Sequence, residues 1–194
     1  EQYTVNETIR AEVRQEFGIG ADDFVIGHVG RFIPLKNQDF LVDILAELHK
    51  TMPSIKLLLV GEGDTMQEVK TKAELAGLKD AVIFTGIRSD VVRLMQAMAT
   101  FLLPSCFAGL PVSLVEAQAA GLPVVASDTI SHDSDITGTI LFKSINEPAA
   151  NWAKCIEEWK EKWGRPDNIE QIKKAGFDSK STVKQLVEIY NGNV

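Results

Sequence analysis

The stretch that most constrains the fold is residues 103–127, LPSCFAGLPVSLVEAQAAGLPVVAS. Its pattern predicts a strand, a tight loop, a helix, a turn and a second strand. Pro111 falls where the helix should take its first turn, a place that suits proline because no N–H is needed there. Gly121 and Pro123 then predict the end of the helix before a β-branched run. A backbone loop that leads into a helix N-terminus is a ready site for an anion.

Short apolar runs of strand length alternate with helical patterns along the rest of the chain. The expected strands are residues 24–29, 56–60, 81–85, 100–103, 124–127 and 139–142. The expected helices are residues 5–17, 38–50, a helix opened by a capping box of Thr65 and Glu68, residues 91–98, the helix between Pro111 and Gly121, and residues 147–163 (capped by Asn146), 167–175 and 181–190. This order predicts an α/β fold, a Rossmann-like parallel sheet with helices on both faces. We expect residues 1–194 to form a single domain, with a core over 24–145 and C-terminal helices over 147–191.

Composition and charge exclude several classes of protein. With 45% hydrophobic and 24% charged residues, the 194-residue chain is typical of a globular domain. Its apolar runs are too short for a membrane span, and its net charge of −7 argues against a nucleic-acid partner. Cys106 and Cys155 suit a reducing compartment, so we expect a cytoplasmic protein. No signal peptide or initiator Met opens the sequence, which suggests an excised fragment.

The ligand of such a sheet binds beyond the carboxyl ends of the strands. The loops expected at that edge are residues 30–37, 61–64, 86–90, 104–110 and 127–134. Arg31 and Lys36 follow the first strand directly, beside Gly30. An Arg fork and a Lys point charge together would neutralise most of a diphosphate without a metal. Two cations alone are more often solvated surface residues, but their position at the ligand edge favours a binding role.

Glu116 lies in the expected helix of the opening stretch, among small and apolar neighbours. A lone helical glutamate is usually solvated, but at this edge its carboxylate could accept from vicinal hydroxyls such as those of a ribose. The N–H groups of Gly109, Leu110 and Val112 could meet a phosphate or sugar oxygen. Ser113 could add its hydroxyl.

Other motifs point away from a nicotinamide enzyme and from a metal site. Residues 61–63 are Gly-Glu-Gly, but the third glycine of a dinucleotide fingerprint is replaced by Met66, so a tight turn is a sufficient interpretation. His28, within a strand, is interpreted as structural. His132, Asp133 and Asp135 are more often solvent-facing than a metal site. We therefore expect no metal and no cofactor.

Several segments together resemble a known family. They are VGRFIPLKN (29–37), LLLVGEG (57–63), VIFTGIRSDV (82–91) and LLPSCFAGLPVSLVEAQAAGLPVVAS (102–127). They are similar to the C-terminal donor-binding domain of family 4 glycosyltransferases, retaining enzymes of the GT-B fold. The match covers most of residues 24–145. The sequence pattern of residues 116–127 resembles that of bacterial capsule or exopolysaccharide enzymes. The resemblance implies one half of a GT-B fold, with the N-terminal acceptor domain outside this chain.

The resemblance also implies a role for each matching residue. Arg31 and Lys36 would hold the diphosphate of a UDP- or GDP-sugar, and Glu116, the second member of a glutamate pair, would bind the ribose. Ile87 and Arg88 would lie near the base. The other expected donor contacts are Gly30, Ser105, Gly109, Leu110, Pro111, Val112 and Ser113. The sugar would pass to a glycan or a lipid-linked acceptor, with membrane docking at the inner face through the other domain.

The chain departs from this family at the first member of the glutamate pair, which is Ala108. Loss of a charge-assisted hydrogen bond to the transferred sugar should cost about 1.5–3 kcal/mol. The family also usually has an acid near Ala99. We therefore expect the isolated domain to bind donor weakly and turn over little. A non-catalytic binding or regulatory module is the main alternative, and a Rossmann NAD-dependent sugar-nucleotide enzyme is less favoured.

Overall fold

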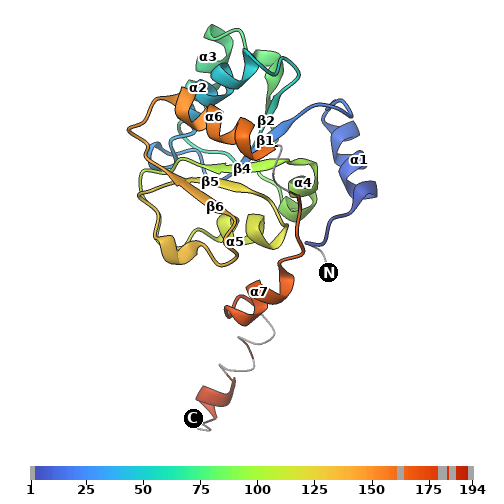
Figure 1. Ribbon diagram of the computed structural model, residues 1–194, viewed down its shortest axis with the longest axis vertical. Helices are drawn as coiled ribbons and strands as arrows, with labels where there is room; N and C mark the ends of the chain where they lie inside the picture. The colour runs from blue at the N-terminus through green and yellow to red at the C-terminus, as the bar shows by residue number, and fades with distance from the viewer. Residues whose placement is uncertain (1–2, 161–163, 179–182, 184–186, 192–194) are drawn as a thin grey trace.

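The computed structural model describes residues 3–160, 164–178, 183 and 187–191. At its centre is a six-stranded sheet in the order β3-β2-β1-β4-β5-β6, with every neighbouring pair parallel (Figure 1). The strands are β1 (Val25–Val29), β2 (Lys56–Val60), β3 (Val82–Phe84), β4 (Thr100–Leu103), β5 (Val124–Ser127) and β6 (Ile140–Lys143). The predicted α/β class and parallel sheet are confirmed.

Both faces of the sheet are apolar because successive side chains of a strand point to opposite sides. In β2, Leu57 and Leu59 belong to one core cluster and Leu58 to the other. The first face packs on α2 (Gln38–His49), α3 (Met66–Leu75) and α6 (Ala149–Lys160). The second packs on α1 (Glu7–Glu16), α4 (Val91–Ala97) and α5 (Val112–Ala119). Helices therefore cover both faces, as predicted.

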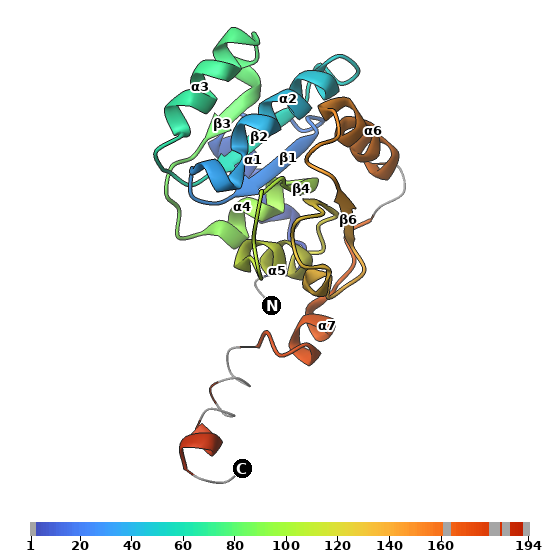
Figure 2. The ribbon, with the colours of Figure 1, turned by 90° about the vertical axis from the view of Figure 1, so that its left-hand side faces the viewer.

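The helix α7 (Ile169–Lys174) lies outside these two layers. Figures 1 and 2 show it below α5, between the sheet and the C-terminal end of the chain. Ile172 contacts Val115 and Ala119 there, in a small apolar cluster separate from the two faces of the sheet. No helix among the described residues is long and apolar enough to cross a membrane.

The order of the strands reverses between β1 and β4. The chain builds β1, β2 and β3 outward to one edge, then returns to place β4 against the other side of β1. At such a reversal the loops after the two central strands leave in opposite directions, which opens a crevice at the carboxyl edge. The loops after β1 and β4 therefore flank the position where a ligand is expected.

A predicted capping box and a predicted helix start are wrong, although α3 does begin directly after Thr65. The side chain of Thr65 makes no capping hydrogen bond, because its backbone has ψ 0° rather than the extended conformation of a capping residue, and its N–H donates to Phe32 O at 3.3 Å. The helix expected from residue 147 begins at Ala149, since a turn closed by Glu147 N–H and Ser144 O at 3.1 Å precedes it. Asn146 is therefore too far from that helix to cap it.

Smaller differences concern the ends of other elements. Pro111 stands one residue before α5 and flanks the helix rather than forming its first turn. Residues 161–163, 181, 182 and 184–186 lie outside the described residues, whereas residues 183 and 187–190 are helical, as expected.

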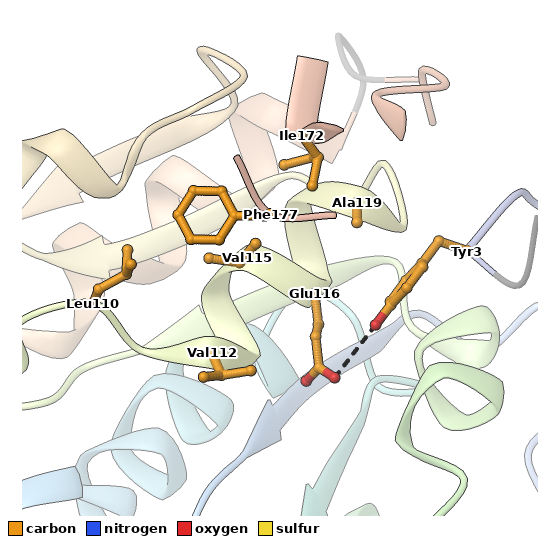
Figure 3. Close-up of a pocket in the computed structure, with 8 residues that line it drawn as sticks. All are labelled: Tyr3, Leu110, Val112, Val115, Glu116, Ala119, Ile172 and Phe177. Atoms are coloured by element: carbon orange, nitrogen blue, oxygen red, sulfur yellow. Dashed lines mark hydrogen bonds between the residues drawn. The ribbon is translucent and has the colours of Figure 1, made fainter. Parts of the chain in front are cut away.

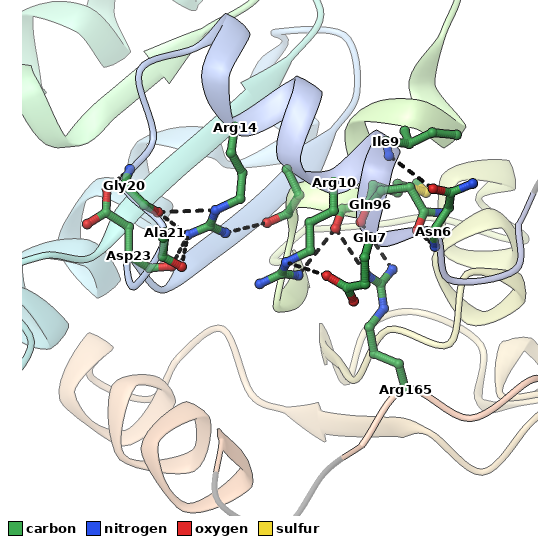
Figure 4. A network of polar contacts seen from close by, with 12 residues as sticks. Asn6, Glu7, Ile9, Arg10, Arg14, Gly20, Ala21, Asp23, Gln96 and Arg165 are labelled. Atoms are coloured by element: carbon green, nitrogen blue, oxygen red, sulfur yellow. Dashed lines mark hydrogen bonds and ion pairs between the residues drawn. The ribbon is translucent and has the colours of Figure 1, made fainter.

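Three guanidinium groups join α1, α4 and α5 through backbone carbonyls (Figure 4). Arg165 donates to Met95 O, Gln96 O and Ala120 O at 3.0–3.3 Å. Arg14, which is 5% exposed, donates to carbonyls after α1 and to the end of α4, and Arg10 donates to Gln96 O at 3.3 Å. The last carbonyls of a helix have no intrahelical partner and carry the negative end of its dipole. Cations at these ends therefore both satisfy and neutralise them.

Arg165→Met should destabilise the fold by about 2–4 kcal/mol, because buried carbonyls of two helix ends lose a charged donor. Chemical unfolding of the 194-residue chain measures the change. The matched control is Lys173→Met, which removes an exposed cation paired with Glu170 at 2.9 Å and should change stability by less than about 0.5 kcal/mol. Equal stability of the two variants would refute the structural role of Arg165.

Candidate functional site

Backbone contacts hold the loop after β1 against the loop after β2. The N–H of Phe32 donates to Glu62 O at 2.9 Å. A Cβ at Gly61 would lie 2.2 Å from Gly30 O, and one at Gly63 would lie 2.2 Å from Phe32 O. Only glycine fits at either position. The Gly-Glu-Gly turn is therefore filled by the protein's own backbone rather than shaped for a pyrophosphate, which confirms the interpretation as a tight turn.

A second set of contacts ties the same loop to the loop after β4. Cys106 N–H donates to Leu35 O at 2.9 Å, and the side-chain amide of Asn37 donates to Pro104 O at 3.2 Å. Asn37 has φ 55°, and no other non-glycine residue of the described part has a positive φ. Asparagine tolerates this left-handed conformation better than most residues do. The loop after β1 is thus fixed on both sides.

Arg31 and Lys36 sit on this fixed loop without a carboxylate partner among the described residues. Arg31 is exposed and Lys36 is half-buried. No Asp or Glu oxygen of the described part lies within ion-pairing distance of either side chain. Burial lowers the pKa of Lys36, because the ammonium loses water and gains no counter-charge. The loop therefore presents positive charge that the chain itself leaves uncompensated.

Arg88, expected beside the base, differs because its charge is already neutralised. Its guanidinium is paired with Asp90 at 2.8 Å and with Glu16 at 2.9 Å, and the hydrogen bond to Asp90 raises its pKa. Ile87 beside it is exposed. Both residues line a hollow of about 530 Å³ together with Gly30 and Arg31. Its other lining residues are Val29, Val60, Gly61, Glu62, Gly63 and Val91.

Glu116 lies in a different hollow, of about 200 Å³ (Figure 3). Its carboxylate points toward Tyr3, whose hydroxyl donates to Oε1 at 3.4 Å. Burial raises the pKa of Glu116, and the Tyr3 hydrogen bond opposes that rise. The rest of the lining is apolar: Leu110, Val112, Val115, Ala119, Ile172 and Phe177. Arg31 and Glu116 thus share the carboxyl edge but not one pocket.

The loop between β4 and α5 leaves backbone donors available. The N–H groups of Val112 and Ser113 have no acceptor within the described residues, as is usual for the first turn of a helix. A Cβ at Gly109 would meet nothing within 4 Å, so this backbone is open to approach. Ala108 is half-buried and forms a parallel bridge with Ile130. Ser105 lies inward, fully buried, and its hydroxyl has no partner among the described residues.

A buried histidine lies below the loop after β1, and it makes polar contacts that the sequence pattern does not predict. His28 is 0% exposed; its Nδ1 lies 2.9 Å from Leu102 O and its Nε2 lies 3.4 Å from the side-chain nitrogen of Gln38. The pKa of His28 is lowered to about 4, mainly by burial and in part by the charge of Lys36, while the hydrogen bond to the Leu102 carbonyl opposes both. The only sequence feature that could have indicated a role for Gln38 is its place as the polar first residue of a helix that follows a cationic loop.

The remaining polar candidates form no metal site. His132 stacks on Phe142 with ring centroids 4.0 Å apart. Within the described part of the chain, no three His, Cys, Asp or Glu side chains are grouped to hold a metal ion.

Gly63→Ala should destabilise the protein by about 1–3 kcal/mol more than Gly77→Ala, as measured by chemical unfolding. Both glycines have a positive φ, so both substitutions strain the backbone. Only at Gly63 does the new Cβ also collide with a carbonyl, since nothing lies within 4 Å of a Cβ at Gly77. Equal losses would show that the two loops separate without cost.

The His28 shift predicts a pH-dependent stability. Because the unfolded chain protonates His28 below about 6.5 and the folded chain only below about 4, the stabilisation is complete above pH 6.5 and is lost as pH falls toward 4. The loss amounts to roughly 3 kcal/mol. Between pH 6.5 and pH 4, the free energy of unfolding of His28→Gln should therefore fall by roughly 3 kcal/mol less than that of the wild type. A wild-type pH dependence in His28→Gln would contradict the prediction.

Comparison with known proteins identifies the family. EpsF of Bacillus subtilis (strain 168) is 35% identical over 195 residues, which cover 98% of this chain and 50% of that protein. The UDP-Gal:alpha-D-GlcNAc-diphosphoundecaprenol alpha-1,3-galactosyltransferase of Escherichia coli is 30% identical over 57% of this chain and 30% of its own length. The structure of Anabaena HepE in complex with UDP-glucose superposes with a TM-score of 0.82 and 26% identity, covering 98% of this chain and 54% of that one.

The chain spans about half the length of EpsF and of HepE. A family model described as "Glycosyl transferases group 1" matches residues 23–160. Together with the parallel sheet, these findings confirm the resemblance to GT-B glycosyltransferases. The chain belongs to the glycosyl transferases group 1 family.

Proposed function

We propose that this chain is the donor-binding domain of a retaining glycosyltransferase and binds a nucleotide-diphosphate-sugar. The observation that carries the proposal is the pair Arg31 and Lys36, held on a rigid loop at the reversal of strand order with no carboxylate of the described residues beside them. HepE, which matches nearly the whole chain, was crystallised with UDP-glucose, and this supports a donor of the same kind.

The donor would lie along the carboxyl edge between the two hollows. Arg31 and Lys36 would bind the diphosphate, with the open N–H groups of Val112 and Ser113 at the α5 N-terminus. Glu116 would accept from the ribose hydroxyls in place of its contact with Tyr3. The further donor contacts proposed are Gly30, Ile87, Arg88, Gly109, Leu110 and Pro111, with Arg88 contributing through its backbone. Ser105, expected from the sequence to contact the donor as well, is fully buried behind this surface.

Catalysis would depend on the charge that develops on the departing diphosphate. Arg31, Lys36 and the positive end of the α5 dipole would stabilise this charge whether the sugar passes through a short-lived oxocarbenium ion or an enzyme-bound intermediate. The partial burial of Lys36 strengthens its interaction with an anion, because less water competes for the ammonium. No step of this scheme needs a metal or another cofactor.

The acceptor side of the reaction is proposed to come from a second domain. The half-length coverage of EpsF and HepE supports this division. The acceptor would be a glycan or a lipid-linked sugar; the E. coli relative is named for a diphosphoundecaprenol acceptor. Such an acceptor would bring the enzyme to the inner face of the membrane through the second domain.

A non-catalytic donor-binding module is favoured by one observation, the methyl group of Ala108 where a sugar-binding glutamate is expected. Ala108→Glu in a chain that carries both domains distinguishes an active enzyme from a non-catalytic module. The transfer rate of an active enzyme should rise or change, whereas a non-catalytic module should remain inactive. A nicotinamide enzyme is less favoured, since Gly61 and Gly63 are packed against the protein's own carbonyls.

The 194-residue chain should bind UDP or GDP more tightly than the corresponding nucleoside, and calorimetric titration of UDP, GDP and ADP tests this. Arg31→Ala and Lys36→Ala should each weaken the diphosphate-dependent affinity about tenfold to a hundredfold, the effect of one charge-assisted contact. The control is Lys56→Ala, which changes net charge equally but at the start of β2, where Lys56 donates to Asp80 O at 2.9 Å. No binding of any diphosphate at millimolar concentration would refute the proposed function.

A further inference from the structure

Two buried polar side chains lie directly beneath the proposed diphosphate loop. His28, on β1, is 0% exposed, and Gln38, the first residue of α2, is 1% exposed. The side-chain nitrogen of Gln38 donates to Arg31 O at 2.8 Å and lies 3.4 Å from His28 Nε2. A Cβ at Gly30 would lie 3.0 Å from His28 Nε2, so the imidazole supports the loop from below.

The carbonyl of Arg31 and the N–H of Phe32 belong to one planar peptide unit. Gln38 holds the carbonyl end at 2.8 Å, and Glu62 O holds the N–H end at 2.9 Å. A peptide fixed at both ends cannot rotate or flip. Its orientation sets the direction in which the Arg31 side chain leaves the backbone.

The hydrogen-bond partners determine where the protons lie. Arg31 O and Leu102 O can only accept, so the Gln38 nitrogen faces the first and a protonated Nδ1 of His28 faces the second. Nε2 of His28 is then unprotonated and accepts from Gln38. A flipped Gln38 amide would place oxygen against oxygen, and a doubly protonated His28 would place hydrogen against hydrogen.

Resting on the proposed function, we propose that Gln38 and His28 are positioning residues for the diphosphate: neutral His28 orients the Gln38 amide, and Gln38 locks the Arg31–Phe32 peptide so that Arg31 is aimed before the donor binds. The strongly lowered pKa of His28 agrees with a neutral ring. Besides Lys36, the groups that face the ring are uncharged: Phe101 and Leu102 O of β4 and Gln38 of α2.

Gln38→Met keeps the length of the side chain and removes its donor. It should weaken the affinity for UDP about three- to tenfold, which is the effect of one neutral hydrogen bond. The affinity for uridine should stay unchanged, because only the phosphates are proposed to contact Arg31. The matched control is Gln96→Met, which removes another buried Gln at the far end of α4 and should change neither affinity. A Gln38→Met chain that binds UDP within twofold of wild type would overturn the proposal.

A double-mutant comparison separates positioning from general damage to the fold. If Gln38 acts through Arg31, Gln38→Met should have no further effect on UDP binding, followed by NMR titration, in the Arg31→Ala background. An equal loss in both backgrounds, or an equal loss of UDP and uridine, would show a merely structural role and overturn the proposal.

The proton position on His28 can be read in the wild-type chain without any nucleotide. Nitrogen-15 NMR at neutral pH should show His28 protonated on Nδ1 only, and this decides the matter if Gln38→Met does not fold. A proton on Nε2 would overturn the pairing, because that nitrogen could no longer accept from Gln38. Failure of wild-type protein to bind any nucleoside diphosphate would refute the proposed function instead, and the two results are therefore distinguishable.

Discussion

The candidate site depends on one constraint, the backbone-to-backbone packing of the loop after β1 on the loop after β2. Gly61 and Gly63 allow the carbonyls of Gly30 and Phe32 to approach to a distance that no side chain would permit. Pairing between β1 and β2 therefore continues beyond the sheet, where twist would otherwise separate the two strands. Arg31 is fixed to the sheet itself rather than to a free loop, so its position follows from the most buried part of the fold.

The protein uses its guanidinium groups in three physically different ways. Arg14 and Arg165 are directed inward, where backbone carbonyls at helix ends satisfy their donors. Arg88 is neutralised by carboxylates of α1 and of its own loop. Among the described residues, neither a backbone carbonyl nor a carboxylate is a partner of the Arg31 guanidinium. This contrast within one chain, rather than the presence of an arginine in a loop, is the reason for proposing that Arg31 binds an external anion.

The sequence predicted the layers well because burial of apolar residues decides them. The strands at 56–60 and 100–103 match the structure residue for residue, since each is a continuous apolar run covered on both faces. The loops at the carboxyl edge followed from the parallel order. The Thr65 cap failed because a carbonyl distant in sequence, at Phe32, took the N–H of Thr65. Local patterns also could not show that Gln38 is buried under Arg31.

The separation of Glu116 from Arg31 had a similar cause. Tyr3, Ile172 and Phe177 shape the hollow around Glu116, and all three are distant from Glu116 in the sequence.

Asn37 has a different consequence. A glycine would adopt its left-handed φ freely, but would lack the amide that ties the loop to Pro104. Asparagine also has fewer conformations than glycine in the unfolded chain, so less entropy is lost when this junction becomes ordered. The loop is therefore ordered by folding itself, and the anion proposed to bind there would meet a preorganised surface, so that little further conformational entropy would be lost on binding.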